Sequence, residues 1–351
     1  MRERVNEKSH HVFQCGSHRG IVLYSSSLDA SVFFNEYVHV KGENVFFKST
    51  GISLTPTKCA ICMTFDNSTE VYQPRLGEET IDEKSFSARR FYGKVNHFRI
   101  VRCKKCGLLR SDPIIDASMV GKLYEGSLLT YESHIPNLRE TYGRYLRRVV
   151  KFLPSKDRLL EIGAGNGFFL EEALEQGFTE VWGVEPSKEA IGKTAQRVKK
   201  NMKLGLFSAT MFPENHFDII CIFQTLEHFV DPATVLADCR KILKPGGVVL
   251  AINHNLESLP VKILGEHSPV VDIEHMYLYS AKTMEKQFET CGLKPVDTFA
   301  VWNRHSFGYL LTLVPLPKVL KDVFVWIARL LRLSELPLLL PIGNVGVVGQ
   351  K

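Results

Sequence analysis

A glycine-rich turn between two apolar runs is the feature that most constrains what this chain can fold into. Residues 159–170 read LLEIGAGNGFFL, and the first four are mostly apolar, as in a strand that is buried on both faces. Three glycines follow, and apolar residues then recur at helical spacing until Gly177, where a helix would end. Strand, turn and helix in this order predict the opening of a βαβ unit, and therefore an α/β fold.

The spacing of the glycines and two nearby carboxylates restrict the ligand that this turn can bind. The pattern is G-x-G-x-G, whereas a dinucleotide fingerprint is G-x-G-x-x-G, with the pyrophosphate at the helix N-terminus. Glu161, just before the glycines, would repel a pyrophosphate but could hold an ammonium group, directly or through water. Glu185 ends the second predicted strand, 180–185, where an acid can accept both hydroxyls of a ribose. A ligand with a ribose and an ammonium group but no phosphate fits S-adenosylmethionine better than NAD.

These residues resemble the class I S-adenosylmethionine-dependent methyltransferases, and the resemblance runs from about residue 144 to the C-terminus. Four blocks match that family in order: LLEIGAGNG, VWGVEPS, FDIICIFQTLEHFVDP and LKPGGVVLAINHN. The resemblance implies a Rossmann-like, doubly wound α/β sheet of seven strands, with S-adenosylmethionine as the cofactor.

The adenine end of the expected cofactor site departs from the family. Its members often carry an acid near the adenine after the third strand, but residues 207–210 here read FSAT. Adenine is therefore expected to contact a backbone group or a hydroxyl, at Ser208 or Ala209. The cofactor-binding residues that the resemblance implies are Glu161, Gly163, Ala164, Gly165, Asn166, Gly167, Glu185, Pro186, Ser208, Ala209, Gln224, Thr225 and Leu226.

Catalytic candidates follow the strand predicted at 217–223. Glu227 and His228 lie beyond its carboxyl end, where open α/β sheets bind their ligands. A base is needed where the methyl acceptor carries a proton of high pKa, and imidazole titrates near neutrality. His228 is the first choice for that base, with Glu227 orienting it or holding a substrate hydroxyl, and His275 and His254 are second choices. The alternative is that the Glu227–His228 pair only shapes the pocket.

Local signals assign two further segments. Ser187 is suited to cap a helix over 188–200, because a hydroxyl can accept a hydrogen bond from the first helical turn. By similarity to the same enzymes, the segment 272–280, DIEHMYLYS, precedes a helix and is expected near a substrate lid, with Tyr277 and Tyr279 beside the site.

Two C-x-x-C pairs, Cys59/Cys62 and Cys103/Cys106, indicate a metal site. Each pair can form a knuckle that presents two thiolates to one tetrahedral Zn²⁺, and four thiolates would leave no open position for catalysis. The gap between the pairs is about twice the usual spacing of a zinc ribbon, so a loop is expected within 66–92. Free core cysteines or a redox pair are the alternatives. The arrangement also resembles a subset of these methyltransferases with an N-terminal zinc-ribbon-like segment, many of which modify sugars or other small metabolites.

These motifs divide the 351 residues into four parts. Residues 1–57 form an N-terminal extension of unassigned structure, 58–114 a zinc-ribbon-like module, 115–156 a helical cap or linker, and 157–351 the domain that binds S-adenosylmethionine. An apolar insertion, 307–341, interrupts the final antiparallel hairpin, and proline and charge break it too often for a spanning helix. The insertion packs on the domain or on a partner subunit, or it lies in a membrane interface.

Composition bears on the partners and the compartment. A net charge of +6, from 44 basic and 38 acidic residues, is mild, so nucleic acid is not expected as a partner. The N-terminus carries charges but no apolar signal segment, which indicates a cytoplasmic protein. In a reducing compartment, eight cysteines with paired spacing favour metal over disulfides.

The leading hypothesis is a methyltransferase that acts on a small molecule, such as a sugar or glycan precursor. An RNA methyltransferase that grips its substrate through the zinc module ranks lower, because basic runs interleaved with aromatic residues are missing from the sequence. A non-catalytic, zinc-bearing interaction protein is the third alternative, although the glycine turn and the ribose acid are both present. The sequence assigns neither the acceptor atom nor the oligomeric state.

Overall fold

The computed structural model of the protein describes residues 38–40, 43–45, 54–76, 81–82, 86, 94–313, 317–341 and 343–351. The chain divides into two compact units, Met1–Gly51 and Ile52–Lys351. The first unit contributes two short antiparallel strands, β1 (Val38–Val40) and β2 (Glu43–Val45). Most of the predicted N-terminal extension, 1–57, lies outside the described residues. All further elements belong to the second unit.

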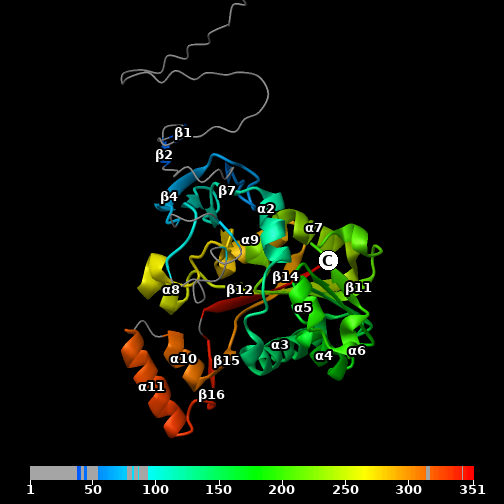
Figure 1. Ribbon diagram of the computed structural model, residues 1–351. Coiled ribbons are helices and arrows are strands. Elements are labelled where there is room, and N and C mark those ends of the chain that lie inside the picture. The colour runs from blue at the N-terminus through cyan, green and yellow to red at the C-terminus, as the bar shows by residue number, and fades with distance from the viewer. Residues whose placement is uncertain are drawn as a thin grey trace, which may run out of the picture. The chain divides into compact units, whose positions relative to one another are not determined.

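A seven-stranded sheet forms the centre of the second unit (Figure 1). From one edge to the other, its strands are β10 (Met202–Leu204), β9 (Glu180–Glu185), β8 (Arg158–Ile162), β11 (Phe217–Phe223), β12 (Leu243–His254), β17 (Asn344–Gln350) and β14 (Lys294–Ala300). The first five strands are parallel, and β17 runs antiparallel to both of its neighbours. This order confirms the doubly wound α/β sheet with a final antiparallel hairpin.

Helices cover both faces of the sheet because alternate strand residues point to opposite sides. Leu160 and Ile162 of β8 pack in the core under α7 and α9, whereas Leu159 packs in the core under α3 and α4. The helices on the two faces are separated by the sheet in Figure 1. The α-helices outside the insertion are α2 (Ala117–Glu125), α3 (Ile135–Val149), α4 (Phe168–Glu175), α5 (Lys188–Gly192), α6 (Gln196–Lys199), α7 (Pro232–Ile242), α8 (Leu259–Leu264) and α9 (Ala281–Thr290).

The single helix expected over 188–200 is wrong, since two short helices, α5 and α6, occupy that range. Ser187 caps the first of them as expected, with its side chain accepting from the Ala190 N–H. Gly192 is the last residue of α5, and glycine disfavours the interior of a helix by about 1 kcal/mol. The chain then becomes extended at Ala195, which precedes α6.

A smaller sheet of four strands joins the cysteine-rich segment to the catalytic part of the chain. Its order is β13 (Tyr277–Leu278), β6 (Leu109–Ser111), β5 (Ile100–Cys103) and β4 (Ser68–Tyr72), with antiparallel neighbours. Two strands, β3 (Leu54–Thr55) and β7 (Ile114–Ile115), pair beside it. Part of the predicted loop over 66–92 is therefore a strand, β4.

The segment predicted to flank a substrate lid, 272–280, differs from that expectation. Tyr277 lies in β13 and is buried, and its hydroxyl donates to the backbone oxygens of Lys58 and Val230. Tyr279 is also fully buried in the core. Tyr277 and Leu278 pair with β6, so this part of the segment is a strand of the small sheet.

The apolar insertion lies between β14 and β17 in the chain, and its described residues form two helices and two short strands. Its elements are β15 (Asn303–Ser306), α10 (Phe307–Leu313), α11 (Lys318–Leu330) and β16 (Pro337–Leu340), and β15 pairs antiparallel with β16. Most apolar side chains of α11 are exposed, so packing of that face on the domain is not borne out in the described part of the insertion. Among the described residues, no helix combines the length and the apolar character needed to cross a membrane.

Candidate functional site

The glycine turn follows β8, and its backbone conformation would not accommodate side chains. Gly163, Gly165 and Gly167 have φ values of 76°, 54° and 76°, in the left-handed region that favours glycine. A Cβ atom at Gly165 would overlap the Tyr131 hydroxyl, and one at Gly163 would overlap the Thr225 side chain. The turn therefore has the tight backbone that was predicted from the sequence.

Two buried carboxyl groups flank this turn. Glu161 is 3% exposed, and its Oε2 atom has no hydrogen-bond partner among the described residues. Burial, reinforced by the negative charge of Glu185, raises the pKa of Glu161 well above its usual range. Glu185 accepts hydrogen bonds from the N–H groups of Gly165 and Ser187, both at 2.8 Å. Each oxygen of Glu185 thus holds one backbone donor and keeps a second lone pair for a ligand.

The glycine turn and the two carboxyl groups beside it fit the cofactor that the sequence predicts. A buried carboxyl without a partner is costly, and a cationic ligand group would offset that cost. Asn166 adds a second buried acceptor, its Oδ1 atom, which also lacks a partner among the described residues. These acceptor oxygens therefore suit a nucleoside with an ammonium group, and the carboxylates would repel a phosphate. Within the site, Glu161 and Asn166 would hold the amino-acid end and Glu185 the ribose.

A segment before α3 covers the glycine turn, and the sequence indicated it only as part of a helical cap. The Tyr131 ring is partly buried, with its hydroxyl over Gly165. Burial, together with the charges of Glu185 and Glu161, raises the pKa of Tyr131. The Ser187 hydroxyl donates to the Ser127 carbonyl at 2.7 Å and so fastens this segment to the end of β9. The apolar spacing that predicted a helix here carried no signal for such a contact.

The groups predicted to contact adenine already form hydrogen bonds within the protein. The Ala209 N–H donates to an Asp238 carboxylate oxygen at 3.1 Å. The Ser208 hydroxyl accepts from the Thr210 N–H and lies 2.9 Å from the Thr210 hydroxyl. Both residues follow β10, next to β9 in the sheet. A bond from the Ala209 amide to adenine would require the bond to Asp238 to break.

The remaining predicted cofactor residues lie around the same edge of the sheet. The Ala164 N–H donates to the Val184 carbonyl, which brings the turn against the end of β9. Gln224 follows β11 with a φ of 47°, a left-handed conformation that is uncommon for a residue with a side chain and is often found at functional sites. Pro186 is partly buried beside Glu185, and Leu226 is fully buried in the core, so Leu226 supports the site rather than lining it.

Three histidines surround the Glu227 carboxylate. Glu227 is 1% exposed and lies in the 3₁₀ turn Leu226–His228, which follows β11. Its two oxygens accept from the His254 backbone N–H at 3.0 Å and from the His254 ring Nδ1 at 2.6 Å. The His228 and His275 rings lie 4.9 Å apart between centroids, as do those of His254 and His275. All four predicted catalytic candidates therefore meet at one place.

The surroundings lower the pKa values of Glu227 and His228 and leave the His254 side chain partly exposed. Burial favours neutral Glu227, but the charge of His254 and its hydrogen bond outweigh burial and lower the pKa of Glu227 to about 2. Burial, with the positive charge of His275, lowers the pKa of His228 to about 3. The His228 ring is further fixed by a 2.8 Å hydrogen bond between its Nδ1 and the Tyr124 hydroxyl. His254 keeps a side-chain exposure of 26%, so it combines a carboxylate partner with access from outside.

Glu227, His228 and His275 also bring their ligand atoms within 4.8 Å of one another, close enough to hold a metal ion. However, the Glu227 carboxylate already accepts two hydrogen bonds from His254. His275 binds the Val270 carbonyl through Nδ1, at 2.8 Å. The arrangement fits proton transfer through a Glu227–His254 pair more directly than it fits a metal centre.

Acid should destabilise the fold through the buried His228. Unfolded histidine binds a proton near pH 6.5, whereas in the fold the pKa of His228 is about 3. Between these values only the unfolded state is protonated, so the unfolding free energy should fall by up to about 1.4 kcal/mol per pH unit. The unfolding free energy, measured by urea titrations between pH 7.5 and pH 4.5, should depend less steeply on pH for His228→Gln than for the wild type. His267→Gln, outside the cluster, is the control, and equal slopes for His228→Gln and the wild type would contradict this account.

The four cysteines of the C-x-x-C pairs converge on one point. The Sγ atoms of Cys59 and Cys106 are 3.4 Å apart, those of Cys62 and Cys103 are 3.8 Å apart, and all four lie within 4.8 Å of one another. Zinc–sulfur bonds of about 2.3 Å in a tetrahedron require sulfurs about 3.8 Å apart, so the geometry fits Zn²⁺. Burial opposes ionisation of Cys103, but hydrogen bonds from the Cys106 and Lys105 backbones lower its pKa to about 7.

Comparison with known proteins points to the same chemistry. A family model described as a methyltransferase domain matches residues 133–298. A ubiquinone biosynthesis O-methyltransferase of Thiobacillus denitrificans is 32% identical over 163 residues, which cover 43% of this chain and 69% of the relative. An uncharacterized methyltransferase of Schizosaccharomyces pombe is 32% identical over 133 residues, or 34% of this chain. That alignment covers 46% of the yeast protein, so the chain spans about half the length of this relative.

Solved structures include a SAM-dependent methyltransferase from Archaeoglobus fulgidus that is 21% identical to this chain, with a TM-score of 0.42. The match covers 63% of this chain and 98% of the archaeal one. The family assignment depends instead on the domain match and on the Thiobacillus relative, which agree with the seven-stranded sheet and its glycine turn. The chain therefore belongs to the methyltransferase family.

Proposed function

We propose that this protein transfers a methyl group from S-adenosylmethionine to a hydroxyl group of a small molecule. The observation that carries the proposal is the pair of buried acids, Glu161 and Glu185, on either side of a glycine hollow that has no room for side chains. The Glu227–His254 pair lies at the carboxyl end of β11 and β12, beyond which ligands of open α/β sheets bind. This position supports the assignment of the pair as a base for methyl transfer.

The mechanism follows from the roles of these side chains. When bound, S-adenosylmethionine supplies an electrophilic methyl group on a positively charged sulfur. Glu161, Glu185 and the glycine turn position it, and holding the reacting atoms in line is worth up to about 7–11 kcal/mol. Glu227 fixes the His254 ring through Nδ1, which leaves Nε2 as the atom that takes the proton from the acceptor hydroxyl. The negative charge of Glu227 then stabilises the imidazolium, so the base role predicted for His228 is transferred to His254.

Two considerations support a small hydroxylated acceptor. A base is required for a hydroxyl, whose pKa is high, and the site contains such a base next to a buried carboxylate. The Thiobacillus relative is named as an O-methyltransferase, and the zinc-ribbon-like subset that this sequence resembles often modifies sugars. Sugars and glycan precursors are therefore the first acceptors to screen. Strongly salt-dependent RNA binding would instead favour an RNA methyltransferase.

Cofactor binding tests the proposal directly. In calorimetry, S-adenosylhomocysteine should bind the protein and NADH should not. Glu185→Gln should raise the Kd for S-adenosylhomocysteine by about 10- to 100-fold, because hydrogen bonds to a charged group contribute about 1.5–3 kcal/mol. Glu180→Gln, at the opposite end of the same strand, is the matched control and should bind like the wild type. NADH binding without S-adenosylhomocysteine binding would overturn the proposal.

The cysteine cluster is proposed to hold a structural Zn²⁺. Four thiolates complete a tetrahedral shell, and the Cys62 N–H donates to Cys59 Sγ at 3.4 Å, as expected for a knuckle. Gly107, with a φ of 82°, permits the tight turn after the second pair. The ion would stabilise the small sheet and take no part in methyl transfer.

A further inference from the structure

Helix α11 of the insertion exposes a continuous apolar face. At 100° per residue, its large apolar side chains other than Val325 fall within one arc of less than half the helix circumference. Their exposed fractions are high, including 72% for Val319, 62% for Trp326 and 67% for Leu330. Ala328 is the one residue of α11 that is buried among those whose burial is described. The helix packs on α10 along one edge and leaves the arc uncovered by the described part of the chain.

The opposite arc of α11 is charged and mainly basic. Lys318, Lys321, Asp322 and Arg329 fall there, and Arg332 follows the helix. Over 301–341 the sequence has five basic and two acidic residues, a net charge of +3. An apolar arc with Trp, Phe and Leu, opposite an arc with Lys and Arg, is typical of a helix that lies in the interface of a bilayer.

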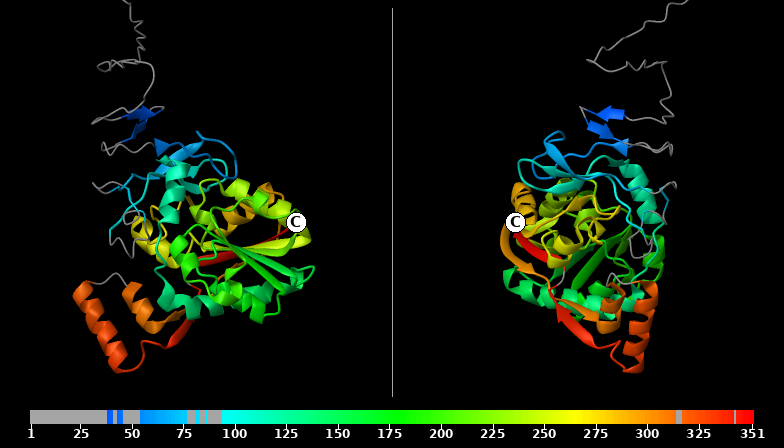
Figure 2. Two further views of the ribbon diagram at one scale, coloured as in Figure 1. Left: turned by 45° about the vertical axis from the view of Figure 1, so that its right-hand side comes forward. Right: turned by 90° about the vertical axis from the view of Figure 1, so that its left-hand side faces the viewer.

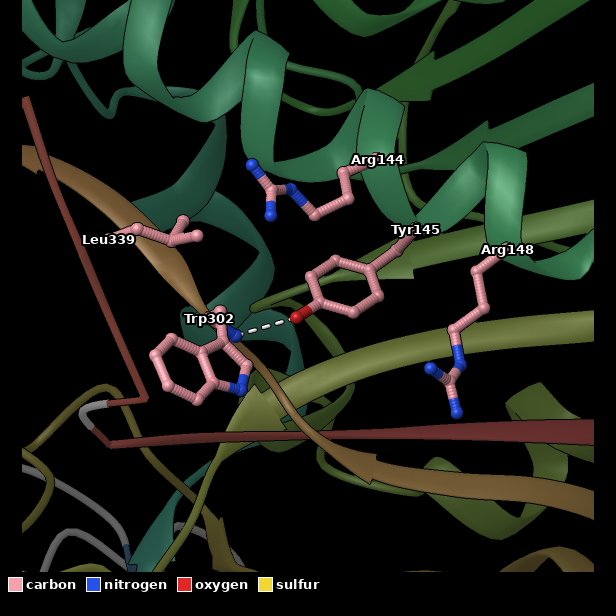
Figure 3. Close-up of a pocket in the computed structure, with 5 residues that line it drawn as sticks. All are labelled: Arg144, Tyr145, Arg148, Trp302 and Leu339. Carbon is pink, nitrogen blue, oxygen red and sulfur yellow. Dashed lines mark hydrogen bonds between the residues drawn. The ribbon is translucent and has the colours of Figure 1, made fainter.

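A basic pocket of about 350 Å³ lies at the base of the insertion (Figure 3). Its lining combines residues of α3 with Trp302, which precedes β15, and Leu339, which lies in β16. Arg148 is held by Asp297 through two hydrogen bonds, of 2.7 and 3.0 Å. The carboxylate nearest to Arg144 is 3.8 Å away, on Glu140, so that ion pair is long. Arg144 can therefore offer its guanidinium to an anionic group that approaches along the insertion.

The insertion begins and ends at the same end of the sheet strands as the predicted cofactor site. His254 at the end of β12 is in register with Asn344 at the start of β17, and the Val301 N–H donates to the Asn344 carbonyl. Residues 302–343 thus begin and end beside the Glu227–His254 pair. The two further views in Figure 2 show α10 and α11 projecting beyond the body of the sheet.

We propose that this insertion docks the protein on an anionic lipid bilayer, with α11 lying in the plane of the interface. Its apolar arc would enter the acyl boundary, while the basic arc and Arg144 would contact lipid phosphates. A second copy of the chain is a poorer occupant, because pairing two such surfaces would bring two net charges of +3 together. A surface rich in anionic lipid supplies the complementary charge. The proposal does not depend on the methyl acceptor.

Vesicle co-sedimentation tests this docking. The full chain should bind to vesicles that mix phosphatidylcholine with phosphatidylglycerol. It should bind much less to vesicles of phosphatidylcholine alone. Because each basic residue near an anionic surface contributes about a fivefold change in binding, Lys321→Gln with Arg329→Gln should weaken binding by about 25-fold. Trp326→Glu with Leu330→Glu should abolish it. The tryptophan fluorescence of the wild type should shift to the blue on binding, and Trp326→Phe should lose most of that shift.

Matched controls separate docking from general stickiness and from misfolding. Ile263→Glu changes a residue of α8 that is 73% exposed, outside the insertion, and should leave vesicle binding unchanged. S-adenosylhomocysteine affinity, which should be equal in all these variants, reports on folding. Equal binding to both vesicle types, or binding that survives Trp326→Glu with Leu330→Glu, would overturn the proposal. A concentration-dependent dimer that this double variant abolishes, without vesicle binding, would assign the face to a second copy.

Discussion

Replacing Glu227 by glutamine should lower kcat by about 10²–10⁴-fold, the range that a positioned base contributes. The carboxylate accepts both the backbone and the ring N–H of His254, and its pKa of about 2 keeps it charged at any pH where the protein would be assayed. An amide oxygen could keep one of these bonds but would not stabilise the imidazolium. Steady-state and single-turnover rates with an identified acceptor would measure the loss.

The control for this substitution is Glu257→Gln, which neutralises an exposed carboxylate just beyond β12 and should keep the wild-type rate. Affinity for S-adenosylhomocysteine should hardly change in either variant, because the proposal assigns that ligand to Glu161 and Glu185 and not to Glu227. His254→Asn should match the loss caused by Glu227→Gln. If Glu227→Gln retained the wild-type kcat, the pair would only shape the pocket and no base would be required.

Replacing Cys103, a proposed zinc ligand, should have the largest effect on stability. Cys103→Ser should lower the unfolding free energy by more than about 4 kcal/mol, since metal binding to such a module is coupled to its folding. The methyl-transfer rate should fall as well, because β6 pairs with β13 and the Met276 N–H donates to the Glu227 carbonyl. Thermal unfolding, zinc analysis and rate measurements on one preparation would test the linkage.

Cofactor affinity should distinguish local from general damage in that experiment. Among the described residues, neither the glycine turn nor Glu185 is hydrogen-bonded to the small sheet, so S-adenosylhomocysteine should bind Cys103→Ser nearly as well as wild type at low temperature. Cys291→Ser, which alters a half-buried thiol outside the cluster, should retain zinc and stability. Loss of cofactor binding alone, with zinc and stability intact, would contradict the proposed division of roles.

The parts of the fold that local patterns determine were predicted well. β8, the glycine turn and α4 follow from a run of apolar residues, three glycines and helical spacing, all within twenty residues. Ser187 marked a helix start, because capping acts on the nearest turn. The break between α5 and α6 was missed, since a single glycine only weakens a helical pattern that its neighbours support.

The candidate site was predictable in its members but not in their pairing. Glu227, His228 and His254 were named from their places after strands and His275 from a family resemblance, yet only the packed structure shows which imidazole the carboxylate binds. The contacts of Tyr131 with the glycine turn and of Tyr124 with His228 join distant parts of the chain. Such contacts depend on tertiary packing, for which helical periodicity carries no signal.

Pairing of β13 with β6 has a consequence for shortened forms of the enzyme. A version that begins at residue 115 would strip one neighbour from β13 and uncover Met276, Tyr277 and Tyr279, all of which are buried in the whole chain. The bared edge and apolar side chains would favour aggregation. The cysteine-rich part therefore cannot be removed without exposing β13, and any shortened transferase should retain it.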